Sequence, residues 1–140
     1  MKIFKFILTV CAAAVVLVWL GSCSRSFVVR VNGRLGATIT FQFYDERGRA
    51  TDATIRRFAV EEQTSTGSWV WVWALTGARR LHELTYGAKY EGLQQLRSPR
   101  KLVPGVKYRV FAEDASGDET GFASAFFSFA ADGTVVFNER

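Results

Sequence analysis

The chain has 140 residues, of which 49% are hydrophobic, and it carries a formal net charge of +5 at pH 7. This length suits one domain, and a hydrophobic content near one half with only two Pro residues excludes a disordered or low-complexity chain. One His and two Cys leave little material for a zinc site or a disulfide scaffold. We therefore expect one globular domain that is stabilised by its core.

The first residues have the features of an export signal. Lys2 and Lys5 give a positively charged start, and residues 6–20 are apolar apart from Thr9. A charged start, a short apolar stretch and small residues before a cleavage point are typical of a secretory signal peptide. The alternative is an uncleaved membrane anchor, which normally needs about 20 apolar residues to cross the bilayer core. The sequence favours the cleaved signal.

The apolar stretch ends in Leu20-Gly21-Ser22-Cys23, which resembles the lipobox of bacterial lipoproteins. That motif has an aliphatic residue, two small residues and then a Cys. In this class a diacylglyceryl group is attached to the Cys sulfur, the signal is cut before the Cys, and the new amino terminus is acylated. The resemblance implies that the bond between Ser22 and Cys23 is cleaved and that Cys23 is the lipid attachment site. Several acyl chains anchor a protein firmly where one chain is marginal.

This resemblance divides the chain into three parts. Residues 1–22 are the signal peptide, residues 23–26 are the lipidated start and a short linker, and residues 27–140 are the domain. Ser24 stands where lipoproteins retained at the inner membrane often have Asp. The resemblance therefore implies the outer membrane of a bacterial envelope rather than the inner one, with the domain facing the periplasm.

Three basic residues follow the expected cleavage site closely in sequence. Arg25, Arg30 and Arg34 are candidates for contact with anionic lipid head groups, at about 1 kcal/mol each when they lie near the surface. The simpler interpretation is that they are solvated residues of the linker and of the first strand. The sequence alone leaves both interpretations open.

From residue 27 onward, apolar and polar residues alternate in segments that turn residues separate, and no segment keeps the apolar spacing of a helix. Residues 86–101 break this rhythm, and Leu93 and Leu96 are spaced for one helical turn. The alternation predicts an all-β sandwich. The strands are expected at residues 27–32, 38–43, 58–61, 69–75, 81–86, 106–110, 122–129 and 134–138.

A second resemblance lies in residues 102–108, Leu-Val-Pro-Gly-Val-Lys-Tyr. This stretch is similar to the one that leads into the penultimate strand of fibronectin type III domains, where the Tyr hydroxyl bonds back to the loop as a tyrosine corner. The resemblance implies an immunoglobulin-like or fibronectin type III-like β-sandwich of about seven or eight strands, with Tyr108 at the corner. The strand expected at 134–138 departs from the seven-strand pattern, so the topology stays open.

Trp69, Trp71 and Trp73 alternate with Val70 and Val72, which places the three indole rings on one face of the predicted strand. One interpretation is a central strand whose Trp side fills the core. The other is an exposed aromatic surface that stacks on sugars or on an apolar partner. Three Trp side chains are bulky for sheets about 10 Å apart, so we expect at least one ring to reach the rim.

Residues suited to catalysis or metal binding are few. His82 and Glu83 form a lone imidazole–carboxylate neighbourhood, and no nucleophile elbow accompanies them. The acidic run 113–119 offers oxygen ligands for Ca²⁺ but lacks the residue order of a calcium loop. We therefore predict no catalytic residue, no metal site and no cofactor.

These observations lead to three hypotheses for function. The first is a non-enzymatic, membrane-anchored lipoprotein that acts as a protein-interaction module in the cell envelope. The second is a glycan-binding module that uses the face of Trp69, Trp71 and Trp73. The third is an accessory lipoprotein of a secretion complex. The expected partners are the membrane, through Cys23, and a protein or a glycan, but not nucleic acid, because no basic helix face is present.

Overall fold

The computed structural model describes residues 27–115 and 120–137. The expected signal peptide, the cleavage site at Ser22 and Cys23, and most of the acidic run 113–119 therefore lie outside the described residues. Within the described residues, no helix is long and apolar enough to span a bilayer.

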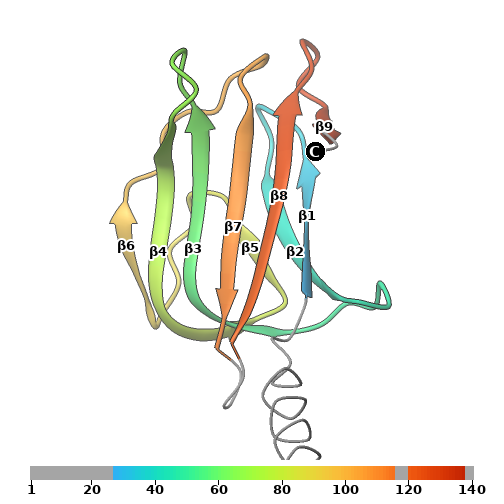
Figure 1. The fold of residues 1–140 in the computed structure, drawn as a ribbon, viewed down its shortest axis with the longest axis vertical. Helices are drawn as coiled ribbons and strands as arrows, with labels where there is room; N and C mark the ends of the chain where they lie inside the picture. Colours follow the sequence, from blue (N-terminus) through green and yellow to red (C-terminus); the bar gives the residue numbers. More distant parts are fainter. Residues whose placement is uncertain (1–26, 116–119, 138–140) are drawn as a thin grey trace, which may run out of the picture.

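The described residues form nine strands in two antiparallel sheets. The smaller sheet has the order β1-β2-β5, and the larger has the order β6-β4-β3-β7-β8-β9. Figure 1 shows the two sheets lying against each other, which confirms the expected all-β, sandwich-like fold. The strands are β1 (Phe27–Gly33), β2 (Ile39–Asp45), β3 (Ala53–Gln63), β4 (Trp69–Leu81), β5 (Glu83–Thr85), β6 (Leu93–Arg97), β7 (Tyr108–Asp114), β8 (Gly121–Phe129) and β9 (Val135–Phe137).

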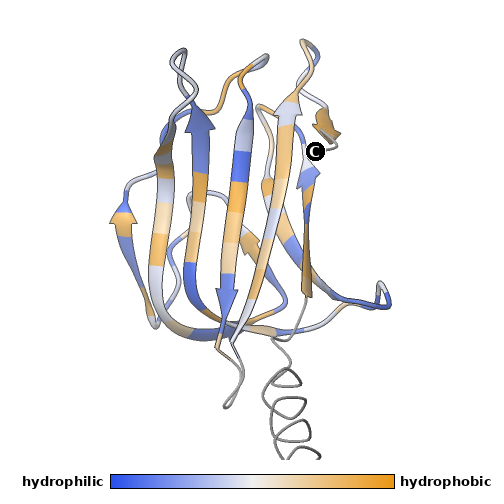
Figure 2. Cartoon of the chain, in the orientation of Figure 1, coloured by the Kyte–Doolittle hydropathy of each residue, from blue (hydrophilic) through white to orange (hydrophobic). Residues whose placement is uncertain are grey.

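The alternation in the sequence explains the smaller sheet. In β1 the side chains of Phe27, Val29 and Val31 are buried, while the residues between them are exposed. Strand β2 repeats the pattern and pairs with β1 over its whole length. Each strand therefore turns one apolar face toward the larger sheet, as period-two alternation requires. In Figure 2 the apolar segments of β3 and β7 lie at mid-strand, with polar segments nearer the ends.

Aromatic rings fill the space between the sheets. Phe41 of β2 meets Phe58 of β3 with the ring centres 5.1 Å apart, and it meets Phe127 of β8 at 6.1 Å. Trp73 packs edge-on against Phe58 at 5.5 Å and against Tyr86 at 5.2 Å. Edge-to-face pairs at these separations are favourable beyond the area they bury. One aromatic cluster thus links both sheets.

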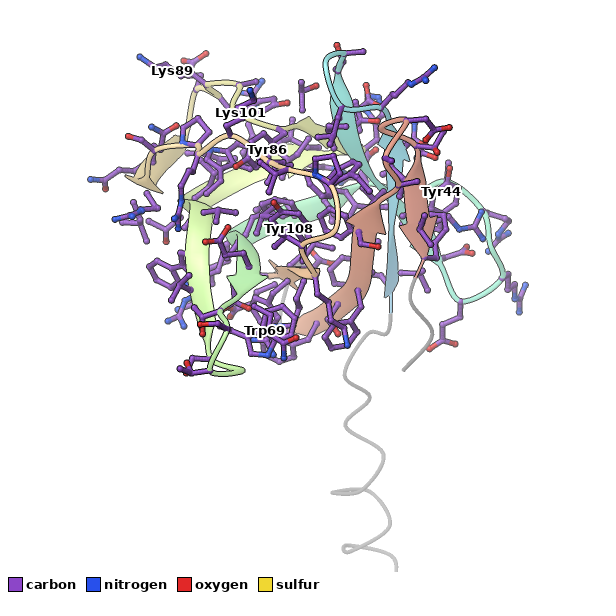
Figure 3. All side chains as sticks on the ribbon, turned by 90° about the horizontal axis from the view of Figure 1, so that it is seen from above. Tyr44, Trp69, Tyr86, Lys89, Lys101 and Tyr108 are labelled. Carbon is purple, nitrogen blue, oxygen red and sulfur yellow. The ribbon has the colours of Figure 1, made fainter. Side chains whose placement is uncertain are left out.

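Tyr108 makes the hydrogen bond to its upstream loop that the resemblance in residues 102–108 implies. Its hydroxyl oxygen accepts the backbone N–H of Val103, five residues upstream, at 2.9 Å. The ring is fully buried and stacks on Phe127 with centres 5.5 Å apart. Figure 3 shows the ring between the two sheets. The hydrogen bond fixes the loop before β7 to the core.

The strand prediction needs one correction in the segment before β7. Residues 93–97 form β6, which pairs with β4, although Leu93 and Leu96 are spaced for a helical turn. The open edge of β4 supplies backbone partners, and a register shift at Leu96 absorbs the helix-like spacing as a bulge. Tertiary pairing thus overrides a weak local preference.

Candidate functional site: the outer face of the larger sheet

The three Trp residues of β4 do not share a face, which corrects the prediction from simple alternation. Trp73 is fully buried, whereas the side chain of Trp71 is 48% exposed. The cause is a bulge, because Val60 pairs with Trp73 and the next residue, Glu61, pairs with Trp71. Val72 is the extra residue, and it is buried as well. The bulge turns Trp73 into the core and leaves Trp71 outside.

The outer face of the larger sheet carries an open groove of about 1000 Å³, which we call the cross-strand groove. It runs across the strands from β6 to β8. Its lining residues are Arg57, Phe58, Ala59, Glu61, Trp71, Ala74, Leu75, Thr76, Leu96, Lys107, Arg109, Phe111, Ser124 and Phe126.

Three small side chains and one Phe form the floor of the groove. Ala59 of β3 pairs with Ala74 of β4 on one side and with Phe111 of β7 on the other. Phe111 pairs in turn with Ser124 of β8. Directly opposed residues point to the same side of a sheet, so these four side chains make one row across four strands. The alanines and the serine leave the row low, and this creates the hollow.

The next row of residues forms a taller, aromatic wall. Its residues oppose one another across the same four strands, and they are Trp71, Glu61, Arg109 and Phe126. The Arg109 guanidinium is held at both sides, by the Glu61 carboxylate at 2.6 Å and by the Trp69 ring at 4.6 Å. Trp69 also packs against Phe126, with ring centres 5.7 Å apart. Figure 3 shows Trp69 on the outer side of the sheet.

Trp71 differs from its neighbours in this wall, because its ring has no aromatic or cationic stacking partner among the described residues. Its side chain lies between the cross-strand groove and a second, smaller hollow of about 540 Å³ that Arg97 and Arg100 also line. Trp is enriched among the residues that dominate the binding energy of interfaces, so this exposed indole is a candidate anchor.

The charges around the groove are unequal. Arg57 lies 3.5 Å from Glu113, and Arg100 lies 3.1 Å from Glu62, so these cations are partly neutralised. Lys107 and Arg97 have no ion-pair partner within the part of the chain that the structure describes. The Lys107 ammonium lies 5.5 Å from the centre of the Phe126 ring. These two cations without a carboxylate partner give the outer face a basic surplus.

The other candidate residues play no part in this site. His82 is exposed between β4 and β5, with its Nε2 4.0 Å from the Glu83 carboxylate. Asp114 is buried, and its Oδ1 accepts the backbone N–H of Thr54 at 2.7 Å, which ties β7 to β3. Across residues 27–115 and 120–137, no group of three or more His, Cys, Asp or Glu side chains is placed to hold a metal ion.

Sequence reasoning missed most of the groove. The sequence predicts a helical turn at Leu96, and Ala59 and Ala74 carry no chemical signal of their own. The alternation in β8 did hold a clue, since Ser124 and Phe126 stand between residues that pack inward. Comparisons of the chain with protein-family models, with curated proteins and with solved structures found no match.

Proposed function

We propose that this chain is a lipid-anchored, non-enzymatic binding module of the bacterial cell envelope. The lipobox resemblance supports an anchor at Cys23, and Ser24 favours the outer membrane with the domain in the periplasm. The cross-strand groove supports a role in binding. The groove holds cations that are mostly paired and an exposed indole, and this combination suits recognition better than acid–base or nucleophilic chemistry.

We also propose that the fold is a variant of the fibronectin type III arrangement. The order β1-β2-β5 corresponds to strands A, B and E of that family, and the neighbours β3, β7 and β8 correspond to C, F and G. The hydrogen bond of Tyr108 to Val103 supports the same assignment. Strands β6 and β9 then extend the larger sheet at its two edges.

The occupant we propose for the groove is an acidic segment of an envelope protein that carries an apolar anchor residue. The observation that carries this proposal is Trp71, which is 48% exposed in the wall of a groove with an apolar floor. The unpaired Lys107 and Arg97 lie on either side of it and complement acidic side chains. An accessory lipoprotein of a secretion complex is one protein that would work in this way.

A glycan is the second candidate occupant. The observation in its favour is that the Trp71 ring is free to stack, since a flat indole fits the apolar face of a sugar. The hydroxyl of Thr76 and the guanidinium of Arg57, which line the same groove, would supply hydrogen bonds.

Site-specific photo-crosslinking in intact cells tests the proposal. A benzophenone side chain at Leu96, which is 52% exposed in the groove, is compared with one at Val28, which is 46% exposed on the smaller sheet. We expect a protein adduct from position 96 alone, and an acidic segment of that protein at the crosslink. An adduct to polysaccharide would support the glycan instead, and equal adducts from both positions would contradict a groove partner.

A pair of matched variants sharpens this test. Trp71→Ala removes the anchor and should lower the yield of the adduct at least tenfold, which corresponds to about 1.4 kcal/mol of binding free energy. Phe137→Ala removes a ring of similar exposure, 58%, from the same sheet but outside the groove, and should leave the yield unchanged. Mass spectrometry of the purified chain tests the anchor, since an unacylated Cys23 behind an intact Met1 would overturn it.

A further inference from the structure

We infer that the end of the sandwich at which β1 begins rests on the bilayer surface, and that the turn at residues 45–49 contacts the lipid head groups. This inference rests on the proposed function, because it requires the lipid at Cys23. Three residues separate Cys23 from Phe27, the first residue of β1. Four extended residue steps span at most about 14 Å, so the domain cannot move far from its anchor.

Phe27 is firmly held at that end of the fold. Its side chain is buried, and its backbone pairs with Asp45, the last residue of β2. The β2–β3 turn therefore begins beside the first residue of β1. Figure 1 shows this turn at the end of the sandwich from which β1 starts, together with the end of β7 and the start of β8.

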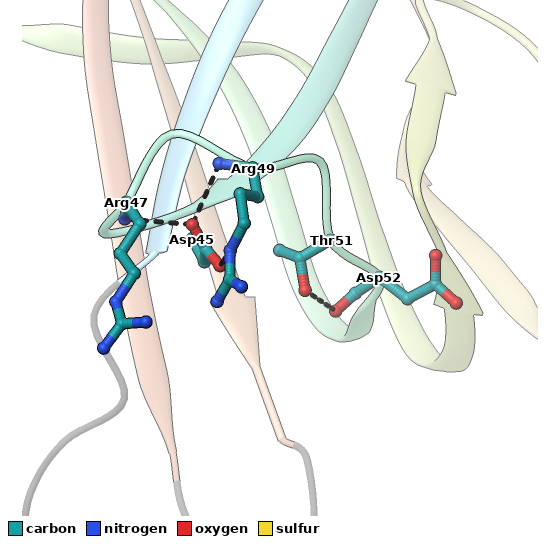
Figure 4. Close-up of polar contacts among 5 residues, drawn as sticks. All are labelled: Asp45, Arg47, Arg49, Thr51 and Asp52. Atoms are coloured by element: carbon teal, nitrogen blue, oxygen red, sulfur yellow. Dashed lines mark hydrogen bonds and ion pairs between the residues drawn. The ribbon is translucent and has the colours of Figure 1, made fainter.

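The turn has a defined shape. The carboxylate of Asp45 accepts the backbone N–H groups of Arg47 and Arg49, each at 2.9 Å, and the Arg49 guanidinium binds the same carboxylate at 2.8 Å (Figure 4). These hydrogen bonds lower the pKa of Asp45, and the one from the Arg49 backbone has the largest effect. Gly48 takes the positive φ of 75° that closes the turn. The contacts leave the exposed Arg47 side chain without an ion-pair partner among the described residues.

Charge alone does not set the orientation. Arg47 and Arg49 are accompanied by Asp45 and Glu46 in the same turn, and Arg80 is paired with Asp52 at 3.1 Å. These six residues carry equal numbers of acidic and basic groups, so the short tether must hold the turn against the membrane. We expect the orientation to persist at high salt, because a covalent tether is not screened.

Arg34 lies at the other end of the domain and is not a membrane contact, although it follows Cys23 closely in sequence. Its Nε donates to the carbonyl of Asp132 at 2.9 Å, and its backbone forms a bridge with Thr134. The seven residues of β1 between Phe27 and Gly33 span about 20 Å, which separates Arg34 from the bilayer. Arg30 differs, since its guanidinium stacks 4.3 Å from the centre of the Tyr44 ring and lies beside Gly48 of the turn.

This placement fixes how the groove meets its partner. The strands stand upright on the membrane, and the groove crosses them, so it runs parallel to the bilayer. Its floor residue Ala59 lies six residues along β3 from Ala53, which is about 20 Å in an extended strand. The partner segment is thus bound at about that height above the lipid head groups.

Fluorescence quenching from the membrane surface tests the orientation. The full chain is acylated in cells, purified and reconstituted into phosphatidylethanolamine–phosphatidylglycerol vesicles that contain a nickel-chelating lipid. A lipidated Cys23 has no free thiol, so Glu46→Cys and Ser65→Cys each offer one reactive thiol for a fluorophore, at opposite ends of the domain. We expect position 46 to be quenched at least threefold more strongly than position 65, with the same ratio in 0.5 M salt.

The outcomes separate the two proposals. Equal quenching at both positions, in protein whose Cys23 carries lipid by mass spectrometry, would overturn the orientation and leave the anchor intact. A chain without lipid at Cys23 would overturn both. As a control, ten Gly and Ser residues inserted before Phe27 should abolish the difference between positions 46 and 65, because the longer tether frees the domain. A difference that survives this insertion would show that the tether does not set the orientation.

Discussion

Two Trp residues of one strand have opposite roles, because a single extra residue separates their faces. Trp73 is fully buried among Phe41, Phe58 and Tyr86, while Trp71 lies in the groove wall. Period-two alternation, which a sequence displays directly, assigns both to one side. The register shift between Val60 and Glu61 depends on the partner strand, so no local pattern in residues 69–75 reveals it.

Substitution of these two residues should separate stability from binding. Trp73→Ala leaves a large cavity in the core and should lower the free energy of unfolding by about 3–5 kcal/mol. Trp71→Ala removes a half-exposed ring and should cost less than about 1 kcal/mol. Urea unfolding followed by circular dichroism measures both. If Trp71→Ala destabilised the domain as much as Trp73→Ala, the assignment of Trp71 to the outer face would be wrong.

Tyr108 tests whether one hydroxyl group stabilises the loop before β7. Tyr108→Phe keeps the packing of the ring but leaves the Val103 N–H without its acceptor, which should cost about 1–3 kcal/mol. Tyr44→Phe is the matched control, because that hydroxyl donates to the partly exposed side chain of Gln42 rather than to a backbone group, and it should cost less than about 0.5 kcal/mol. Equal losses for the two variants in urea unfolding would argue against a special role for Tyr108.

At the scale of whole elements, the edge strand β6 depends on one close backbone approach. Gly77 of β4 has φ of 152°, and a Cβ atom added there would lie 2.2 Å from the carbonyl oxygen of Gly92. Gly77→Ala should therefore push β6 away from β4 and increase the hydrogen exchange of the β6 amides at least tenfold. The control is Gly105→Ala, which also has a positive φ but no atom within 4 Å of the added Cβ. Unchanged exchange in β6 for Gly77→Ala would refute this prediction.

The elements that sequence alone predicts are those with one buried face. Alternation located β1, β2 and β8 to within two residues of their observed bounds. It failed at β6, which has little apolar character and forms because the edge of β4 is free. It also placed the start of β3 at residue 58, although the strand begins at Ala53. The groove was invisible for the same reason, since it arises from four strands whose order no local pattern specifies.

At the scale of the whole molecule, the anchor, the fold and the groove act together in the proposed function. In that proposal, a tether of a few residues fixes which end of the sandwich faces the membrane. The sheet order then determines where the row of small residues lies, with Trp71 in the wall beside it. Removal of any one of the three would alter where, or whether, a partner is held. The stability of the sandwich is therefore a condition for its binding.

That stability should depend on pH in the alkaline range. Burial raises the pKa of Tyr86 and of Tyr108 above the ordinary value of 10.0. The folded chain thus holds these phenolic protons more tightly than the unfolded chain does. Their contribution to stability is complete below pH 10 and is lost as pH rises beyond it. Each of these two residues can steepen the fall of the unfolding free energy by up to about 1.4 kcal/mol per pH unit.

Tyr86→Phe should make this alkaline decline shallower. The variant loses the hydrogen bond that the Tyr86 hydroxyl donates to the carbonyl of Arg100 at 2.6 Å, so it should be less stable at pH 7. Above pH 10, however, it has one fewer phenol to ionise, and its unfolding free energy should fall less steeply with pH. Phe127→Leu is the control, because it weakens the core without removing a titrating group and should keep the slope of the native chain. Urea unfolding at intervals from pH 8 to 12 measures the slope of the unfolding free energy against pH for all three chains. If the slope of Tyr86→Phe is the same as that of the native chain, the buried phenol does not govern alkaline stability.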